Sequence, residues 1–160
     1  LQPEKNLVGE IYRYIADNGG AFIQPGFYET FGLTVVESMI SGLPTFATLY
    51  GGPREIIENG KSGYHLDPNN NEEMIQIVTD FFEKVKKDKS HWEKISKGGI
   101  KRVNEKYTWK KYANRLITYS SIYSFWKYVT NLERQGLQTY LKTLYNLLFR
   151  PLAKNEFQRK

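Results

Sequence analysis

Apolar runs and helix-like periodic segments alternate in the first part of the chain. Residues 21–23 form an uninterrupted apolar run that ends at a Pro-Gly pair, which favours a buried strand. A short helix is expected from about residue 33 to 41, because Gly42 suits a helix end and Pro44 cannot continue a helix. A second short run with strand character, Thr-Phe-Ala-Thr, follows at residues 45–48 and is bounded by Pro44 and Gly51. This strand–helix–strand order with compact connections predicts a parallel sheet and an α/β fold.

Amphipathic helices are predicted on both sides of this unit. Residues 9–17 have helical periodicity and stop at two glycines. Asn71 is expected to cap a longer helix with an apolar face made of Met74, Ile75, Val78, Phe81, Phe82 and Val85. A Ser-x-x-Glu capping pattern at residues 90–93 predicts a further helix. Gly98 and Gly99 are expected to weaken or break it, at about 1 kcal/mol per glycine relative to alanine.

The last third of the chain carries aromatic residues at helical spacing. They recur at intervals of three and four along one predicted helix face: Trp109, Tyr112, Leu116, Tyr119, Tyr123 and Trp126. A second apolar stripe follows Gly136: Leu137, Tyr140, Leu141, Leu144 and Leu148. Such a face is typical of packing against another protein surface rather than of ligand binding.

Composition narrows the possible functions. The chain has 160 residues, 40% of them apolar and 25% charged, as expected for one globular domain. It has no cysteine, which excludes disulfides and thiolate metal sites. The net charge of +6 is spread among interleaved acidic residues, so we expect no nucleic-acid partner. No apolar run is long enough for a membrane helix, so we expect no membrane partner and a cytoplasmic location.

The loop between the first strand and the helix has the features of an anion site. The first N–H groups of a helix have no partner within the helix, and they lie at the positive end of its dipole. Gly32 lacks a Cβ, so a ligand can approach its backbone closely. The Thr34 hydroxyl can donate to the same anion.

Two carboxylates frame this predicted anion site. Glu29 precedes the helix and Glu37 lies one turn inside it. Carboxylates accept hydrogen bonds from pairs of hydroxyls, so the pattern suits a sugar nucleotide, with its diphosphate in the middle and a sugar at each end. A second interpretation needs no ligand, because residues 34–37 also match a Thr-x-x-Glu capping box.

The sequence around the two carboxylates resembles a known family. Residues 22–48, FIQPGFYETFGLTVVESMISGLPTFAT, followed by Gly-Gly-Pro, resemble the donor-binding region of retaining glycosyltransferases with the two-Rossmann-domain (GT-B) architecture. More narrowly, the chain resembles the sucrose synthase family. That resemblance continues through HWEKISKGG, EKYTW, FWKYVTNLER and RPLA, and so covers nearly the whole chain.

The resemblance implies a fold and a reaction. Residues 1–106 would be the C-terminal part of a Rossmann-like nucleotide-binding domain. Residues 107–160 would be a long helical tail that packs back on an N-terminal domain outside this chain. The full enzyme would convert sucrose and UDP reversibly into UDP-glucose and fructose, with retention and without a metal or other cofactor. The family's catalytic histidine and its phosphate-binding arginine and lysine lie upstream. The family commonly forms homotetramers.

The resemblance also implies roles for single residues. Glu29 would be the catalytic carboxylate that binds glucose hydroxyls, and Glu37 would hold the ribose hydroxyls. Backbone N–H groups at residues 31–33 (Phe31, Gly32 and Leu33) would donate to the glucose and the diphosphate, and Thr34 would contact a phosphate. Gln2 would contact the uracil. Val8 stands where the family usually has a base-contacting asparagine, so we expect ADP to serve as well as UDP.

Three alternatives share these features. One is a sister transferase such as sucrose-phosphate synthase. Another is a nucleotide-sugar binding module without catalysis. The last is a structural domain in which Glu37 only caps a helix.

Overall fold

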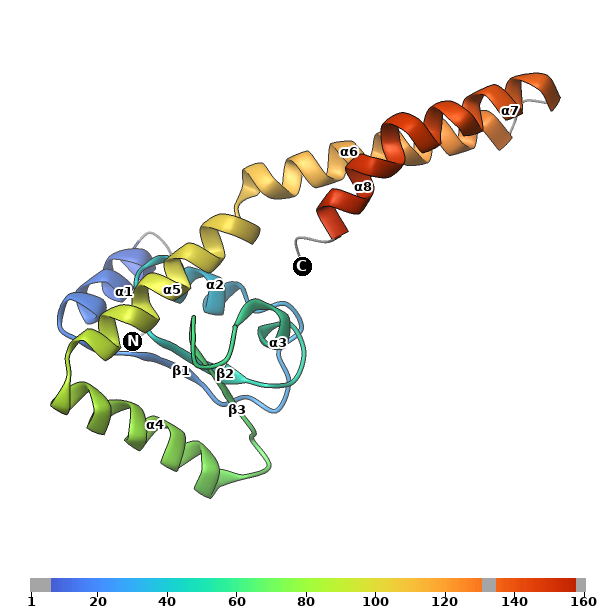
Figure 1. Ribbon diagram of the computed structural model, residues 1–160. Coiled ribbons are helices and arrows are strands. Elements are labelled where there is room, and N and C mark those ends of the chain that lie inside the picture. Colours follow the sequence, from blue (N-terminus) through green and yellow to red (C-terminus); the bar gives the residue numbers. More distant parts are fainter. Residues whose placement is uncertain (1–6, 131–134, 158–160) are drawn as a thin grey trace. The chain divides into compact units, whose positions relative to one another are not determined.

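The computed structural model describes residues 7–130 and 135–157 and divides the chain into two compact units, Leu1–Thr108 and Trp109–Lys160 (Figure 1). The elements of the first unit are α1 (Val8–Asp17), β1 (Phe22–Gln24), α2 (Leu33–Ile40), β2 (Thr45–Thr48), α3 (Pro53–Ile56), β3 (Tyr64–Leu66), α4 (Asn71–Lys87) and α5 (Ser90–Lys106). The second unit contains α6 (Trp109–Thr130), α7 (Gln135–Leu144), the π-helical turn η2 (Tyr145–Phe149) and α8 (Arg150–Phe157).

The sheet of the first unit is parallel, with the strands in the order β1-β2-β3. Phe22 pairs with Thr45 and Gln24 with Ala47, while Ala47 also faces His65 of β3. All four residues of the central strand β2 are buried. The predicted α/β fold with a parallel sheet is therefore confirmed.

Apolar side chains form a cluster on each face of the sheet. Ala47 packs against α2, α3 and α5 in a cluster of Val35, Met39, Ala47, Ile56, Ile57 and Val103. Phe46 points to the other face, where α4 lies in Figure 1, in a cluster of Phe46, Leu66, Phe81 and Ile95. The alternation of neighbouring residues along β2 explains why both faces carry a core.

Helix α5 differs from the prediction, because it runs through Gly98 and Gly99 without a break. A Cβ on Gly98 would lie 2.1 Å from the carbonyl oxygen of Lys61, and one on Gly99 would lie 3.3 Å from that of Ser62. These glycines therefore let the helix pack closely on a loop, and that packing outweighs their low helix propensity.

The predicted helix starts also need correction. Asn70, not Asn71, caps α4, and its side chain accepts a hydrogen bond from the Glu73 amide at 3.1 Å. Ser90 does not cap α5: the N-cap residue is Lys89, which makes no capping bond, and Asp88 accepts from the Ser90 amide at 2.9 Å and from its hydroxyl at 2.7 Å. Sequence spacing located both helices, but it did not identify which polar side chain meets the first turn.

The second unit is helical, and much of the predicted aromatic face of α6 is exposed. The exposed members are Trp109, Tyr112, Leu116, Tyr119 and Tyr123. The last member of the predicted face, Trp126, contacts Tyr145 instead, and its neighbour Phe125 contacts Tyr145 and Phe149. Among the helices that the structure describes, none combines the length and apolar character needed to cross a membrane. Packing of this unit on an N-terminal domain stays a prediction.

Candidate functional site

The site forms where β1 ends and the chain turns into α2. Parallel strands bring their carboxyl ends to one edge of a sheet, and ligands of open α/β sheets bind outside that edge. β1 ends at Gln24, and the loop at residues 25–32 leads directly to the first turn of α2. This loop carries three of the predicted binding residues, Glu29, Phe31 and Gly32, and the first turn of α2 carries Leu33 and Thr34.

Gly32 shapes the start of α2. Its φ of 92° lies in the left-handed region, which glycine adopts without strain. A Cβ at this position would lie 3.0 Å from Cδ1 of Ile56, so the space also favours glycine. The first helical hydrogen bond runs from the Val36 amide to the Gly32 carbonyl at 3.0 Å. The amides of residues 33–35 precede that bond and point out of the helix end, as an anion site requires.

The Glu29 carboxylate is fixed in front of this helix end by three hydrogen bonds. Its Oε1 accepts from the Gly32 amide at 3.1 Å and from the Phe31 amide at 3.3 Å. Its Oε2 accepts from Nε2 of Gln24 at 2.8 Å. The Gln24 bond, followed by the Gly32 and Phe31 amides, lowers the pKa of Glu29 against the opposing effect of burial. The carboxylate is therefore ionised and oriented at neutral pH.

Two glycines after β2 hold the Glu29 loop from behind. The Gly52 amide donates to the Glu29 carbonyl at 2.8 Å, and the Glu29 amide donates to the Tyr50 carbonyl at 3.3 Å. A Cβ on Gly51 would lie 2.0 Å from the Glu29 carbonyl oxygen, and one on Gly52 would lie 2.0 Å from that of Phe31. No larger residue fits at either position while the loop keeps this path.

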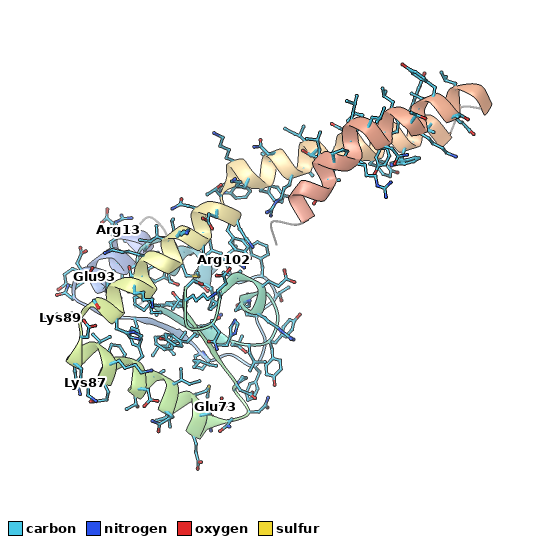
Figure 2. All side chains as sticks on the ribbon, in the orientation of Figure 1. Arg13, Glu73, Lys87, Lys89, Glu93 and Arg102 are labelled. Carbon is cyan, nitrogen blue, oxygen red and sulfur yellow. The ribbon has the colours of Figure 1, made fainter. Side chains whose placement is uncertain are left out.

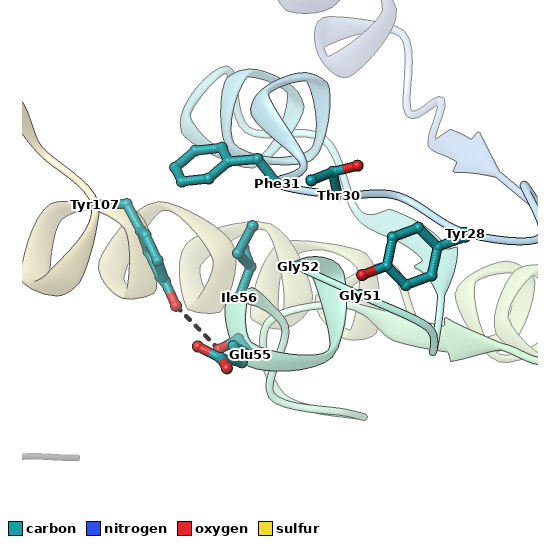
Figure 3. A pocket seen from close by; sticks show the side chains of 8 residues that line it. All are labelled: Tyr28, Thr30, Phe31, Gly51, Gly52, Glu55, Ile56 and Tyr107. Carbon is teal, nitrogen blue, oxygen red and sulfur yellow. Dashed lines mark hydrogen bonds between the residues drawn. The ribbon is translucent and has the colours of Figure 1, made fainter.

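A hollow of about 360 Å³ opens beside the loop (Figure 3). It is lined by Tyr28, Thr30, Phe31, Gly51, Gly52, Glu55, Ile56 and Tyr107. Figure 3 shows the Tyr107 hydroxyl directed at Glu55, where it donates to the backbone carbonyl at 3.0 Å. Aromatic rings, exposed backbone and one carboxylate therefore share this surface.

Arg102 anchors the short helix α3 that lines the hollow. From α5 it donates to the carbonyls of Ile56 at 3.0 Å and Glu55 at 2.8 Å, and it pairs with the Glu58 carboxylate at 2.7 Å (Figure 2). The Arg102 side chain is only 12% exposed, whereas that of its partner Glu58 is 49% exposed. These bonds fix the end of α3 and, through Gly51 and Gly52, the segment behind Glu29.

The second predicted carboxylate has a different environment. Glu37 is exposed on α2. Burial, and then the charge of Glu37, raise the pKa of Tyr12 on α1, so the Glu37 carboxylate lies near that hydroxyl. The capping-box interpretation of residues 34–37 is wrong, because α2 already begins at Leu33 with Gly32 as its cap and no capping side chain. Thr34 and Glu37 both lie inside the helix.

The structure brings most of the predicted site residues together. Glu29, Phe31, Gly32, Leu33 and Thr34 are consecutive parts of one loop and helix end. Phe31 and Leu33 are each 60% exposed.

This arrangement leaves other predictions untested. Gln2 lies outside the described residues. Within residues 7–130 and 135–157, no group of three His, Cys, Asp or Glu side chains could hold a metal ion. Metal independence remains an expectation.

Sequence reasoning assigns no site role to four residues that the structure places there: Gln24, Gly51, Gly52 and Tyr107. For Gln24, a polar residue directly after an apolar run is a signal for a role at the carboxyl edge of the sheet. The contacts of the other three join segments far apart in the sequence, which spacing does not reveal.

Comparison with known proteins places the chain in a family. The family model described as "Glycosyl transferases group 1" matches residues 4–102. The chain is 59% identical over 147 residues to sucrose synthase 2 of Tulipa gesneriana, covering 92% of this chain and 18% of that protein. It is 55% identical over 153 residues to sucrose synthase of Nitrosomonas europaea, covering 96% of this chain and 19% of that protein. The predicted resemblance is confirmed, although the chain spans less than a fifth of either relative.

A solved structure supports the fold. The C-terminal domain of a glycosyl transferase group 1 family protein from Francisella tularensis aligns with a TM-score of 0.56 and 26% sequence identity. The match covers 68% of this chain and 52% of that domain. The predicted relation to the C-terminal domain of GT-B enzymes is therefore confirmed.

Proposed function

Because the chain belongs to the group 1 glycosyl transferases, we propose that it forms the donor-binding part of an enzyme that converts sucrose and UDP or ADP reversibly into UDP- or ADP-glucose and fructose. The identity of 55–59% to sucrose synthases across more than nine-tenths of the chain supports this reaction over other transfers. The acceptor side is assigned to a second domain outside these 160 residues.

The observation that carries the proposal is the Glu29 carboxylate fixed in front of the α2 N-terminus. The diphosphate binds at the amides of residues 33–35, which precede the first helical hydrogen bond, and at the Thr34 hydroxyl. The amides of Phe31 and Gly32 already donate to Glu29, so their main role is to orient that carboxylate. Any hydrogen bond that they make to the nucleotide sugar is shared with Glu29. The helix end thus supplies positive partial charge without a metal.

The same geometry suits the chemistry of transfer. In sucrose cleavage the bond between glucose C1 and the fructosyl oxygen breaks, a bond from C1 to a diphosphate oxygen forms on the same face, and fructose takes up a proton. In the reverse direction, negative charge develops on the departing diphosphate, next to the helix N-terminus. Glu29 accepts hydrogen bonds from glucose hydroxyls and holds the hexose over this position.

Glu37 holds the other end of the nucleotide sugar. Its carboxylate is exposed and free to accept from both ribose hydroxyls, one turn along α2 from the diphosphate amides. Gln2 is assigned to the base. A cytoplasmic homotetramer is proposed by resemblance.

The test is a sucrose cleavage assay on the full-length protein that carries this chain. Protein, sucrose and UDP together should release UDP-glucose and fructose, and ADP should replace UDP. The 160-residue chain by itself should be inactive, because both domains are needed to exclude water and to surround the diphosphate with charge. Full-length protein that forms no nucleotide sugar with either nucleotide, or an isolated chain that cleaves sucrose above a no-protein blank, would contradict the proposal.

A further inference from the structure

Gln24 is held rigidly at the edge of the site. It is the last residue of β1, and it pairs in register with Ala47 of the buried central strand. Its Nε2 donates to Oε2 of Glu29 at 2.8 Å across the loop. Strand β1 therefore fixes the position of Gln24, and the Gln24 amide group fixes Oε2 of the Glu29 carboxylate.

The other end of the Gln24 amide is buried without a partner. Oε1 has no hydrogen-bond donor among the residues that the structure describes. Rotating the amide by 180° would turn this oxygen toward Oε2 of Glu29, where two acceptors would repel each other. The amide orientation is thus set by the ionised carboxylate, and the fold bears the cost of an unpaired buried oxygen.

This cost argues against a purely structural reason for a glutamine here. An apolar side chain of the same length would fill the space and leave no unpaired oxygen. What only the amide supplies is a charge-assisted hydrogen bond to Glu29.

The number of hydrogen bonds to Glu29 shows which acceptor positions of its carboxylate are still unused. A carboxylate has about four acceptor positions. The Phe31 and Gly32 amides use both positions of Oε1, and Gln24 uses one position of Oε2. The remaining position is on Oε2, the oxygen that Gln24 orients.

We propose that Gln24 is a positioning residue, which holds Oε2 of Glu29 in the direction that accepts a hydroxyl of the donor hexose. The inference rests on the proposed function, because it explains how the proposed site orients the hexose of its substrate. Gln24 does not touch the reacting atoms, so its effect reaches the reaction through Glu29.

The test compares Gln24→Met with wild type in the full-length protein. Methionine keeps the length of the side chain and removes both the donor and the unpaired oxygen. Gln76→Met is the matched control, because Gln76 also donates to a carboxylate, that of Asp80 at 2.6 Å, but on the exposed face of α4.

The inference predicts a specific combination of results. In Gln24→Met the kcat for sucrose cleavage should fall by roughly tenfold or more, the scale of one charge-assisted hydrogen bond. The Kd for UDP and the Tm should stay close to wild type. The acid limb of the kcat profile should move to higher pH, because Gln24 is the largest cause of the lowered pKa of Glu29. No charged side chain contributes to that lowering in the described part of the chain. Gln76→Met should change none of these.

Two results would overturn the inference. One is a Gln24→Met protein whose kcat and pH profile stay within about twofold of wild type, a change well below one hydrogen bond. The other is a parallel loss of Tm, UDP affinity and kcat, which would assign Gln24 to the fold alone. Wild-type protein that binds no UDP and cleaves no sucrose would overturn the proposed function, and this inference with it.

Discussion

At the residue scale, two carboxylates that look equivalent in the sequence have different surroundings. Glu29 is fixed by three hydrogen bonds, and these lower its pKa. Glu37 is exposed on α2 and caps nothing in the part of the chain that the structure describes. A fixed carboxylate suits alignment of a reacting hexose, whereas an exposed one suits binding of a ribose that does not react.

His65 makes a pH-dependent contribution to stability. Its Nε2 lies 3.3 Å from the Pro53 carbonyl oxygen, and burial, more than the nearby Arg54, lowers its pKa in spite of that contact. The unfolded chain therefore binds a proton more readily than the folded one below about pH 6.5. The free energy of unfolding should fall as the pH drops from there through the folded pKa.

Replacing His65 by a residue that does not titrate tests whether His65 causes this loss of stability at low pH. His65→Gln keeps a donor for the carbonyl but does not titrate. Thermal unfolding of the full-length protein between about pH 7.5 and 5.5, a range that spans the ordinary histidine pKa, should show a smaller loss of Tm in the variant than in wild type. Equal losses in both proteins would count against His65 as the source.

At the scale of elements, the sequence predicted what local periodicity determines. The segments at 21–23 and 45–48 became β1 and β2. β2 is buried on both faces, as a central parallel strand is, whereas β1 is only partly buried and Ile23 is 46% exposed, so the prediction of a buried strand is wrong for β1. The course of α5 was wrong, since helix propensity at Gly98 and Gly99 competes with a close approach to the loop at residues 61–62. That approach joins segments more than thirty residues apart, and single-residue propensities carry no information about it.

Substitution of the two helical glycines at positions 98 and 136 distinguishes the effect of helix propensity on stability from the effect of close packing. Glycine to alanine normally stabilises a helix by about 1 kcal/mol. Gly136 in α7 has open space around it, so Gly136→Ala should raise stability by up to about that amount. Gly98→Ala should lower stability instead, because its Cβ would lie 2.1 Å from the Lys61 carbonyl oxygen.

Thermal unfolding of the two variants in the same full-length background makes the comparison. We expect Gly136→Ala to raise the Tm and Gly98→Ala to lower it. Stabilisation by both substitutions would show that α5 does not need the close approach at Gly98.

The site was predictable to the same extent as the fold. Glu29, Gly32 and Thr34 were found because they lie close together in a strand–loop–helix segment with a recognisable spacing. The support from Gly51 and Gly52 was not, because the two loops meet only after the sheet has formed. Sequence spacing thus predicted the residues proposed to bind a ligand, and the structure added the residues that hold their loop in place.

At the scale of the whole molecule, the proposed function assigns this chain one side of a larger site. The chain spans 18–19% of the sucrose synthases with which it was compared. Its second unit exposes aromatic side chains, such as Trp109 at 84% and Tyr123 at 69%. Exposed faces of this kind suit packing on further protein, which agrees with a donor-binding part that works within a longer enzyme.

The most direct test of the account is calorimetric titration of UDP into the full-length protein and its Glu37→Gln variant. Gln keeps the size of the side chain but loses the charge that strengthens hydrogen bonds to two ribose hydroxyls. Glu73→Gln is the matched control, since Glu73 lies in the first turn of α4 and bonds to the cap residue Asn70 (Figure 2). A Glu29→Gln variant tests the proposed contact of Glu29 with the hexose of the nucleotide sugar.

The account predicts that Glu37→Gln weakens UDP binding by roughly tenfold or more, since one charge-assisted hydrogen bond is worth about 1.5–3 kcal/mol. The Tm without ligand should barely move. Glu29→Gln should lower kcat and spare UDP binding, and Glu73→Gln should leave both unchanged. UDP affinity that is the same in Glu37→Gln as in wild type would contradict the assignment of the donor site to α2.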